Sequence, residues 1–152
     1  MTNEEYEELV VEKKLSGRRV TPDGIAAKII AVAYFTGEEA VRGSSDSRVY
    51  LADNSAMKGV YTSYSIIEEG NLDVAQVSRQ LLTFCIITVQ NGFTFVGKSA
   101  CADPMNFNAE IGRRLAYEDA YRQVMSHEGY LLKENIYNET KVSVSKEEKS
   151  EQ

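Results

Sequence analysis

The sequence predicts an α+β domain, in which a small antiparallel sheet centred on a β-hairpin over residues 83–99 packs against helices. The dipeptide Asn91-Gly92 separates two runs of β-branched and aromatic residues, which is the strongest short-range hairpin signal. Apolar residues at helical spacing predict helices over about 22–35 and 107–125. The chain has 152 residues, of which 43% are hydrophobic, so it is long enough to bury a real core.

The first helix is expected to begin at Thr21-Pro22-Asp23. Threonine caps helices, proline suits the first helical position, and an aspartate complements the helix dipole. Ile25, Ile29 and Val32 follow at helical spacing, so the helix is predicted to continue to about residue 35 and to stop near Gly37.

The hairpin is predicted to contain strands over 83–90 and 93–99, joined by a type I′ turn at Asn91-Gly92. A two-residue loop would pair Thr88 with Phe95 and Ile86 with Gly97. Both faces are then largely apolar, and a second subunit is a natural cover for one of them. Residues 38–82 are less regular: we expect a loop over 43–46, strands within 48–52 and 59–67, and a helix over 72–82.

The second helix is predicted to begin at Asn106 or Asn108 and to end at about Met125. Ile111 and Leu115 are expected to point to the core. An adjacent face of small residues would let another backbone approach closely; it comprises Ala109, Gly112, Ala116 and Ala120. Arg113 and Tyr117 lie four apart on another side. Glu110 precedes Arg114 by four residues, so a helical ion pair explains that arginine.

The two ends of the chain are expected to be appendages. Residues 1–18 form an N-terminal helical extension, residues 19–137 the domain, and residues 138–152 a charged, disordered tail. The acidic N-terminus does not resemble a signal peptide, and no apolar run is long enough to span a membrane. We therefore expect a protein that stays in the cytoplasm and does not interact with membranes.

Composition argues against several classes of function. A net charge of −6 disfavours charge-driven binding to nucleic acids. A single histidine, His127, and two separated cysteines, Cys85 and Cys101, do not make a convincing zinc site, and the cysteines are expected to be buried, reduced thiols. No nucleophile motif and no phosphate-binding glycine loop is present. The sequence therefore predicts a binding protein without catalysis, cofactor or metal.

Residues 83–132 follow a recognisable pattern. Its parts are the hairpin with Asn-Gly-Phe-Thr, the run Gly-Lys-Ser-Ala-Cys-Ala-Asp-Pro, the helix start Asn-Phe-Asn-Ala-Glu-Ile-Gly-Arg-Arg-Leu-Ala and the closing Glu-Gly-Tyr-Leu-Leu. This pattern, together with Arg-Val-Thr-Pro-Asp-Gly-Ile over 19–25, resembles a family of small tailed-phage proteins of unknown role. Relative to its short members, residues 38–82 are an insertion, and Tyr117 replaces an expected basic residue.

The pattern is also similar to the first type of phage Thoeris anti-defence protein. That resemblance implies a homo-oligomer, of which a hexamer is one form, in the host bacterial cytoplasm. It implies that the protein sequesters a cyclic ADP-ribose-type or cyclic oligonucleotide immune signal without cleaving it. The alternative is a phage accessory protein that acts through protein–protein interaction, and a nucleotide hydrolase is a third possibility.

A site for such a signal needs groups for a base, a ribose and a pyrophosphate. Phe93 or Phe107 could stack on the base, and Asn91, Asp103 and Asn106 could bind base or ribose edges. The guanidinium groups of Arg113 and Arg114 match phosphate geometry. Simpler interpretations remain open: Asn91 suits the turn, Asp103 and Asn106 suit turns and caps, Phe93 could pack, and Arg114 could pair with Glu110. Arg113 is the favoured anion ligand.

Overall fold

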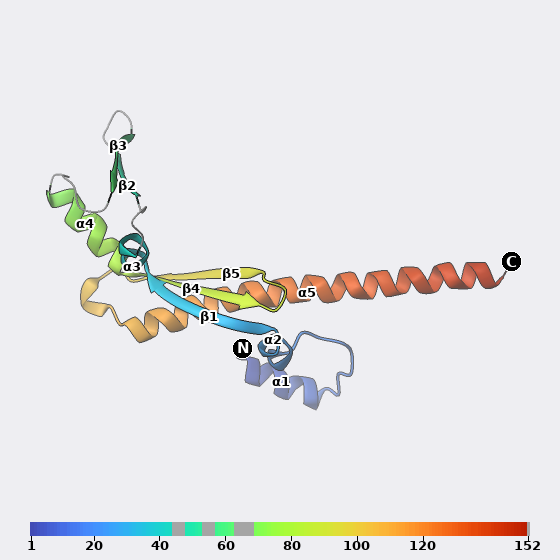
Figure 1. Cartoon of the computed structure of the whole chain (residues 1–152). Coiled ribbons are helices and arrows are strands. Elements are labelled where there is room, and N and C mark those ends of the chain that lie inside the picture. Colours follow the sequence, from blue (N-terminus) through green and yellow to red (C-terminus); the bar gives the residue numbers. More distant parts are fainter. Residues whose placement is uncertain (44–47, 53–56, 63–68, 152) are drawn as a thin grey trace. The chain divides into compact units, whose positions relative to one another are not determined.

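The computed structural model of the chain describes residues 1–43, 48–52, 57–62 and 69–151 (Figure 1). The chain divides into two compact units. One unit comprises residues 1–29 and 122–152, and the other comprises residues 30–121. The long helix α5 (Ala109–Ser150) contributes its first part to the second unit and its remainder to the first.

The second unit is built on a three-stranded antiparallel sheet of order β1-β4-β5, which confirms the α+β class (Figure 1). Its strands are β1 (Ile29–Thr36), β4 (Leu82–Val89) and β5 (Thr94–Ala100). The predicted helix over 22–35 is wrong in its second half. Thr21 caps a helix as expected, but that helix, α2, covers only Pro22–Ala26. The β-branched and aromatic run that follows favours a strand. Its pairing with β4 outweighs the fact that Ile25, Ile29 and Val32 recur at helical spacing.

The hairpin has the predicted strands but a different register. Val89 and Phe93 close a three-residue loop, and Ile87 pairs with Phe95 where Thr88 was expected. Within this loop only Gly92 has a positive φ, of 84°, whereas a type I′ turn needs two such residues. The one-residue difference exchanges the faces of β5, because side chains alternate along a strand. Phe95 and Gly97 are consequently buried on the same face as Cys85 and Ile87.

Helix α5 covers this buried face at very close range. Asn108 caps the helix as predicted, since its Oδ1 accepts from the backbone N–H groups of residues 110 and 111. Gly112, Ala116 and Ala120 face the sheet, and a β-carbon on Gly97 would lie 2.1 Å from the carbonyl oxygen of Ala116. The expected close approach of a backbone is therefore confirmed. The expectation that Ile111 and Leu115 point to the core is wrong, because both are exposed.

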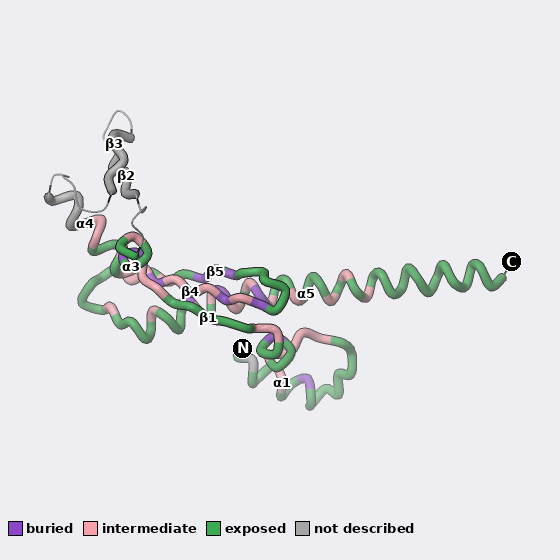
Figure 2. Tube along the Cα trace, in the orientation of Figure 1, coloured by how far each residue is buried: buried purple, intermediate pink, exposed green. Residues whose placement is uncertain are grey.

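Helix α5 continues well beyond the predicted end at about Met125, through the expected tail, to Ser150 (Figure 2). A glycine inside a helix costs only about 1 kcal/mol, so Gly129 does not end it. Hydroxyl groups of residues 140, 143 and 145 each donate to the carbonyl oxygen four residues earlier, which satisfies them within the helix. Residues 139–150 are exposed throughout, which agrees with their charged composition.

The remaining elements of the second unit are α3 (Gly37–Arg42), β2 (Arg48–Ala52), β3 (Met57–Thr62) and α4 (Glu69–Gln80). They confirm the predicted strand over 48–52 and place a helix close to the one expected over 72–82. The loop over 43–46 and the end of the 59–67 run lie mostly outside the described residues. Glu38 is buried and accepts hydrogen bonds from Arg42 (2.7 Å) and Arg79 (2.8 Å), which ties α3 to α4.

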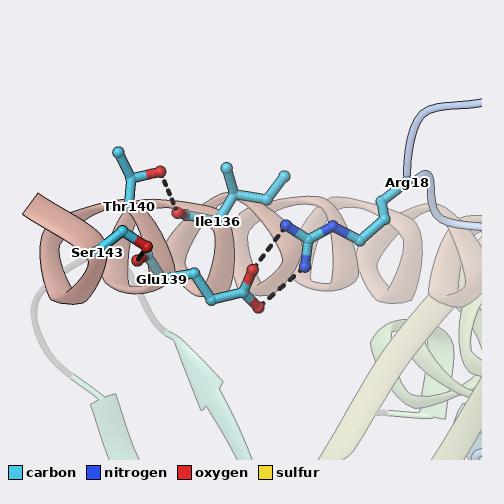
Figure 3. A network of polar contacts seen from close by, with 5 residues as sticks. All are labelled: Arg18, Ile136, Glu139, Thr140 and Ser143. Carbon is cyan, nitrogen blue, oxygen red and sulfur yellow. Dashed lines mark hydrogen bonds and ion pairs between the residues drawn. The ribbon is translucent and has the colours of Figure 1, made fainter.

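The first unit contains α1 (Asn3–Glu12), α2 and the later part of α5. A capping box formed by Thr2 and Glu5 starts α1 within the predicted N-terminal extension. Arg18 donates two hydrogen bonds to Glu139, at 2.9 and 2.8 Å (Figure 3). Further ion pairs join Arg19 to Glu7 and Lys28 to Glu128.

Candidate functional site

The seven predicted ligand residues do not form one cluster. Asn91 and Phe93 lie at the hairpin loop, whereas Asp103, Asn106 and Phe107 follow the far end of β5. Since β5 has seven residues and a strand rises about 3.3 Å per residue, the two groups are roughly 20 Å apart. They belong to opposite ends of the hairpin.

At the loop, Asn91 and Phe93 each make an interaction within the hairpin. Asn91 Oδ1 accepts from the backbone N–H of Phe93 at 3.0 Å, which stabilises the loop. The ring of Phe93 is tilted against that of Phe95, with centroids 5.0 Å apart, and remains 53% exposed. Phe93 therefore retains an open ring surface, while the amide oxygen of Asn91 serves the loop.

At the other end, Asp103 Oδ1 accepts from the backbone N–H of Met105 at 2.9 Å and caps a short 3₁₀ helix, Pro104–Asn106. Asn106 and Phe107 line a cavity of about 110 Å³. Its other lining residues are Leu81, Ser99, Ala100, Cys101, Asn108, Ile111, Gly112 and Leu115. Ligand pockets usually measure about 300–1,000 Å³, so this cavity is too small for a nucleotide.

The two arginines of α5 differ in their environment. The Nε of Arg114 lies 3.3 Å from Glu118 Oε1, so its partner is Glu118 rather than the predicted Glu110, and its side chain is 81% exposed. An exposed pair of this kind contributes little to stability. Arg113 has no carboxylate partner among the residues that the structure describes. Its guanidinium instead lies close enough to Tyr34 of β1 to influence its ionisation.

Three tyrosines accompany Arg113. Tyr117 and Tyr121 follow it at intervals of four residues along α5, and their rings stack with centroids 5.8 Å apart. Tyr34 reaches the same region from β1, and its hydroxyl donates a hydrogen bond to the thiol of Cys85 in β4. We call the surface formed by Tyr34, Arg113, Tyr117 and Tyr121 the tyrosine–arginine face.

The packing of α5 explains why this face exists. The row Gly112, Ala116 and Ala120 immediately precedes the row Arg113, Tyr117 and Tyr121 in the sequence. Because its side chains are small, the glycine–alanine row packs closely against the sheet, and the adjacent row with Arg113 and the two tyrosines therefore lies beside β1. The four-residue interval of the tyrosines beside the small-residue row could have indicated this surface, although Tyr34 could not be found this way, since β1 was expected to be helical.

The ionisation of the face follows from its partial burial. Burial is the main cause that raises the pKa of Tyr34; Cys85 and Tyr117 add to it, while the charge of Arg113 opposes it. Burial also raises the pKa values of Tyr117 and Tyr121. A tyrosine hydroxyl group is protonated at neutral pH even with its ordinary pKa of about 10, and the raised pKa values leave all three protonated.

The sheet and the tyrosine–arginine face lie within a region of the chain that matches a known protein family. A model described as the "Phage protein (N4 Gp49/phage Sf6 gene 66) family" matches residues 20–136, which include the sheet and the tyrosine–arginine face. The chain belongs to this phage protein family. No curated protein and no solved structure matches it significantly. The predicted resemblance to a family of small phage proteins is thus confirmed.

Further features of this phage protein concern membrane-spanning helices, metal ligands, thiols and its histidine. Among the described residues, no helix is long and apolar enough to cross a membrane, and no three potential ligands are grouped to hold a metal ion. Cys85 is buried, as expected, whereas Cys101 is partly exposed; both are free thiols. His127 Nδ1 lies 2.9 Å from the carbonyl oxygen of Gln123, within α5.

Proposed function

We propose that this phage protein binds a cyclic ADP-ribose-type signal, or a cyclic oligonucleotide, on its tyrosine–arginine face and sequesters it without cleavage. In the host bacterial cytoplasm this would block Thoeris-like immunity. The observation that carries the proposal is the position of Arg113, which lacks a carboxylate partner among the described residues and lies beside Tyr34 at the start of a row of tyrosines.

The groups present suit the parts of such a ligand. A guanidinium binds phosphate oxygens through two parallel hydrogen bonds. Aromatic rings stack on bases, and tyrosine hydroxyl groups can bind ribose or phosphate oxygens. The neutral hydroxyl groups of Tyr117 and Tyr121 can donate to an anion without repelling it, whereas the hydroxyl group of Tyr34 already donates to Cys85.

The same properties favour sequestration over hydrolysis. A general base must accept a proton near neutral pH. The raised pKa values of the three tyrosines and the permanent charge of Arg113 make all four groups poor bases. Of the predicted ligand residues the proposal retains Arg113, and it adds Tyr34, Tyr117 and Tyr121.

The test is a depletion experiment. The purified chain is incubated with cyclic ADP-ribose isomers and with cyclic oligonucleotides, filtered, heated, and both fractions are analysed by mass spectrometry. We expect one ligand to be depleted from the filtrate and recovered intact from the denatured protein. Recovery of fragments would instead indicate a hydrolase. If every nucleotide stays in the filtrate, sequestration is excluded and the alternative of a protein–protein role stands.

A matched pair of variants assigns the binding residue. Arg113→Ala is expected to weaken binding at least about tenfold, the usual effect of losing a charge-assisted hydrogen bond. Arg114→Ala removes the neighbouring guanidinium, which is engaged by Glu118, and is expected to change the affinity less than about twofold. Equal effects of the two variants would exclude Arg113 as the specific ligand.

A further inference from the structure

A second concave surface lies on the other side of α5 from the tyrosine–arginine face. Successive residues of a helix are about 100° apart, so Ile111 and Leu115 lie about 200° around the helix from Arg113 and Tyr117 respectively. Ile111 is 58% exposed and Leu115 is 49% exposed, although both are aliphatic. The β5–α5 pocket is the cavity of about 110 Å³ that these two residues line together with others, among them Leu81, Cys101, Asn106 and Phe107.

The polar groups in the wall of the β5–α5 pocket already have partners within the protein. Ser99 Oγ donates to the carbonyl oxygen of Gly112 at 2.7 Å, and Cys101 Sγ donates to the carbonyl oxygen of Asp103 at 3.2 Å. Asn108 Oδ1 accepts from the backbone N–H groups of residues 110 and 111. Most of the remaining wall consists of aliphatic and aromatic side chains. The pocket therefore favours an apolar group, which gains free energy when it leaves water.

The volume of the pocket limits the group that it can take. An apolar cavity of about 150 Å³ holds a benzene ring. The β5–α5 pocket, at about 110 Å³, is smaller and suits a branched or short aliphatic group. In proteins such a group is the side chain of a leucine, an isoleucine or a methionine.

The rim of the pocket is polar and acidic. The side-chain amide of Asn106 makes no hydrogen bond to any residue that the structure describes, and an amide can both donate to and accept from a peptide backbone. Two exposed carboxylates, of Asp103 and Glu110, lie next to residues that line the pocket. The nearby guanidinium of Arg114 is paired with Glu118. The charge around the pocket therefore complements basic residues of a partner.

We propose that the β5–α5 pocket binds a peptide segment of another protein, in which one leucine-like side chain is flanked by lysine or arginine. The aliphatic side chain enters the pocket, the amide of Asn106 binds the peptide backbone, and Asp103 and Glu110 attract the basic residues. An apolar anchor in a pocket with a polar rim is the usual arrangement of a protein-binding hot spot. Since this pocket and the tyrosine–arginine face lie on different sides of α5, a partner and a nucleotide can bind together.

The test is an NMR titration of the ¹⁵N-labelled full chain with the peptide acetyl-Lys-Lys-Leu-Lys-Lys-amide. Saturable shifts are expected for the backbone amide signals of Leu81, Cys101, Ile111 and Leu115. Replacing the leucine of the peptide by alanine should weaken binding about tenfold, because most of the buried apolar area is lost. Replacing its lysines by glutamate should abolish binding. Absence of binding, equal binding of the leucine and alanine peptides, or shifts confined to other residues would overturn the proposal.

A matched pair of variants locates the peptide. Ile111→Lys places a charge at the mouth of the pocket and is expected to weaken binding at least about tenfold. Val142→Lys, at a position of α5 that is 53% exposed, is the control and should bind the peptide like the native chain. Saturating peptide should also slow the reaction of Cys101 with a thiol reagent severalfold, because Cys101 lines the pocket. Equal affinities of the two variants, or unchanged labelling of Cys101, would contradict binding at this site.

Two further outcomes separate this proposal from its alternatives. If the signals of Ile111 and Leu115 shift when the native chain alone is diluted, a second copy occupies the pocket and the proposal is overturned. Arg113→Ala should bind the peptide with native affinity, whether or not the native chain binds a nucleotide. If Arg113→Ala weakens peptide binding as much as Ile111→Lys does, the two surfaces are not separate and the proposal fails.

Discussion

Gly97 of β5 and Ala116 of α5 are in contact through their backbones: a β-carbon on Gly97 would lie 2.1 Å from the carbonyl oxygen of Ala116. The helix reaches this depth because Gly112, Ala116 and Ala120 present almost no side chain to the sheet. The tyrosine–arginine face therefore depends on the row of small residues beside it.

Gly97→Ala is expected to destabilise the fold by about 3 kcal/mol, because the added methyl group overlaps backbone atoms that cannot rotate away. The measurement is urea unfolding followed by circular dichroism. Gly129→Ala is the control. No atom lies within 4 Å of a β-carbon there, so the helix should gain about 1 kcal/mol. Equal stability of the two variants would contradict the close packing of α5.

Glu38→Gln is expected to lower the free energy of unfolding by about 2 kcal/mol at pH 7, since hydrogen bonds to a charged group from Arg42 and Arg79 are weakened. Burial alone would raise the pKa of Glu38, but the two guanidinium groups lower it overall. A lowered pKa stabilises the fold above the unfolded-state value of about 4.3, and this contribution is lost as the pH falls through the folded-state pKa.

The stabilities of the native chain and Glu38→Gln should therefore converge progressively as the pH falls below the unfolded-state value of about 4.3 and through the lower folded-state pKa. Chemical unfolding at a series of pH values measures this. Glu118→Gln, which removes the exposed partner of Arg114, is the control and should change stability by less than about 0.5 kcal/mol at any pH. A difference between native chain and Glu38→Gln that stays constant with pH would show that the charge of Glu38 is not responsible.

The two thiols should react at very different rates in the folded protein. Cys85 is fully buried and burial raises its pKa, so little reactive thiolate is present, whereas Cys101 is partly exposed. Titration with a thiol reagent at pH 8 is expected to label one cysteine per chain, and both in denaturant. Cys101→Ser should remain unlabelled until it unfolds. Rapid labelling of folded Cys101→Ser would contradict the burial of Cys85 beneath Tyr34.

In the proposed function, Tyr117 contributes to nucleotide affinity mainly through stacking of its ring on a base. Tyr117→Phe keeps the stacking surface and is expected to change nucleotide affinity only a few-fold. Tyr117→Ala removes the ring and is expected to weaken binding tenfold or more, since stacking contributes about 1–3 kcal/mol per base. Equilibrium dialysis measures both. Equal losses would indicate that the hydroxyl group, not the ring, makes the contact.

Local sequence signals determined several elements of this protein. Asn91-Gly92 gave the position of the hairpin, although not its loop length. Asn108 marked the start of α5, and Thr21 the start of α2. The small residues of α5 indicated a close backbone contact before its partner, Gly97, was known. These features follow from backbone conformation and capping, which depend on a few neighbouring residues.

Tertiary structure decided the rest. Residues 29–36 have helical spacing and strand propensity at once, and only pairing with β4 makes them a strand. The hairpin register depends on which face α5 covers, so it could not be obtained from the turn alone. Arg113 was the favoured anion ligand in the sequence, but its neighbour Tyr34 is 79 positions away in the chain. Their proximity is set by the depth at which α5 packs on the sheet, which no short segment encodes.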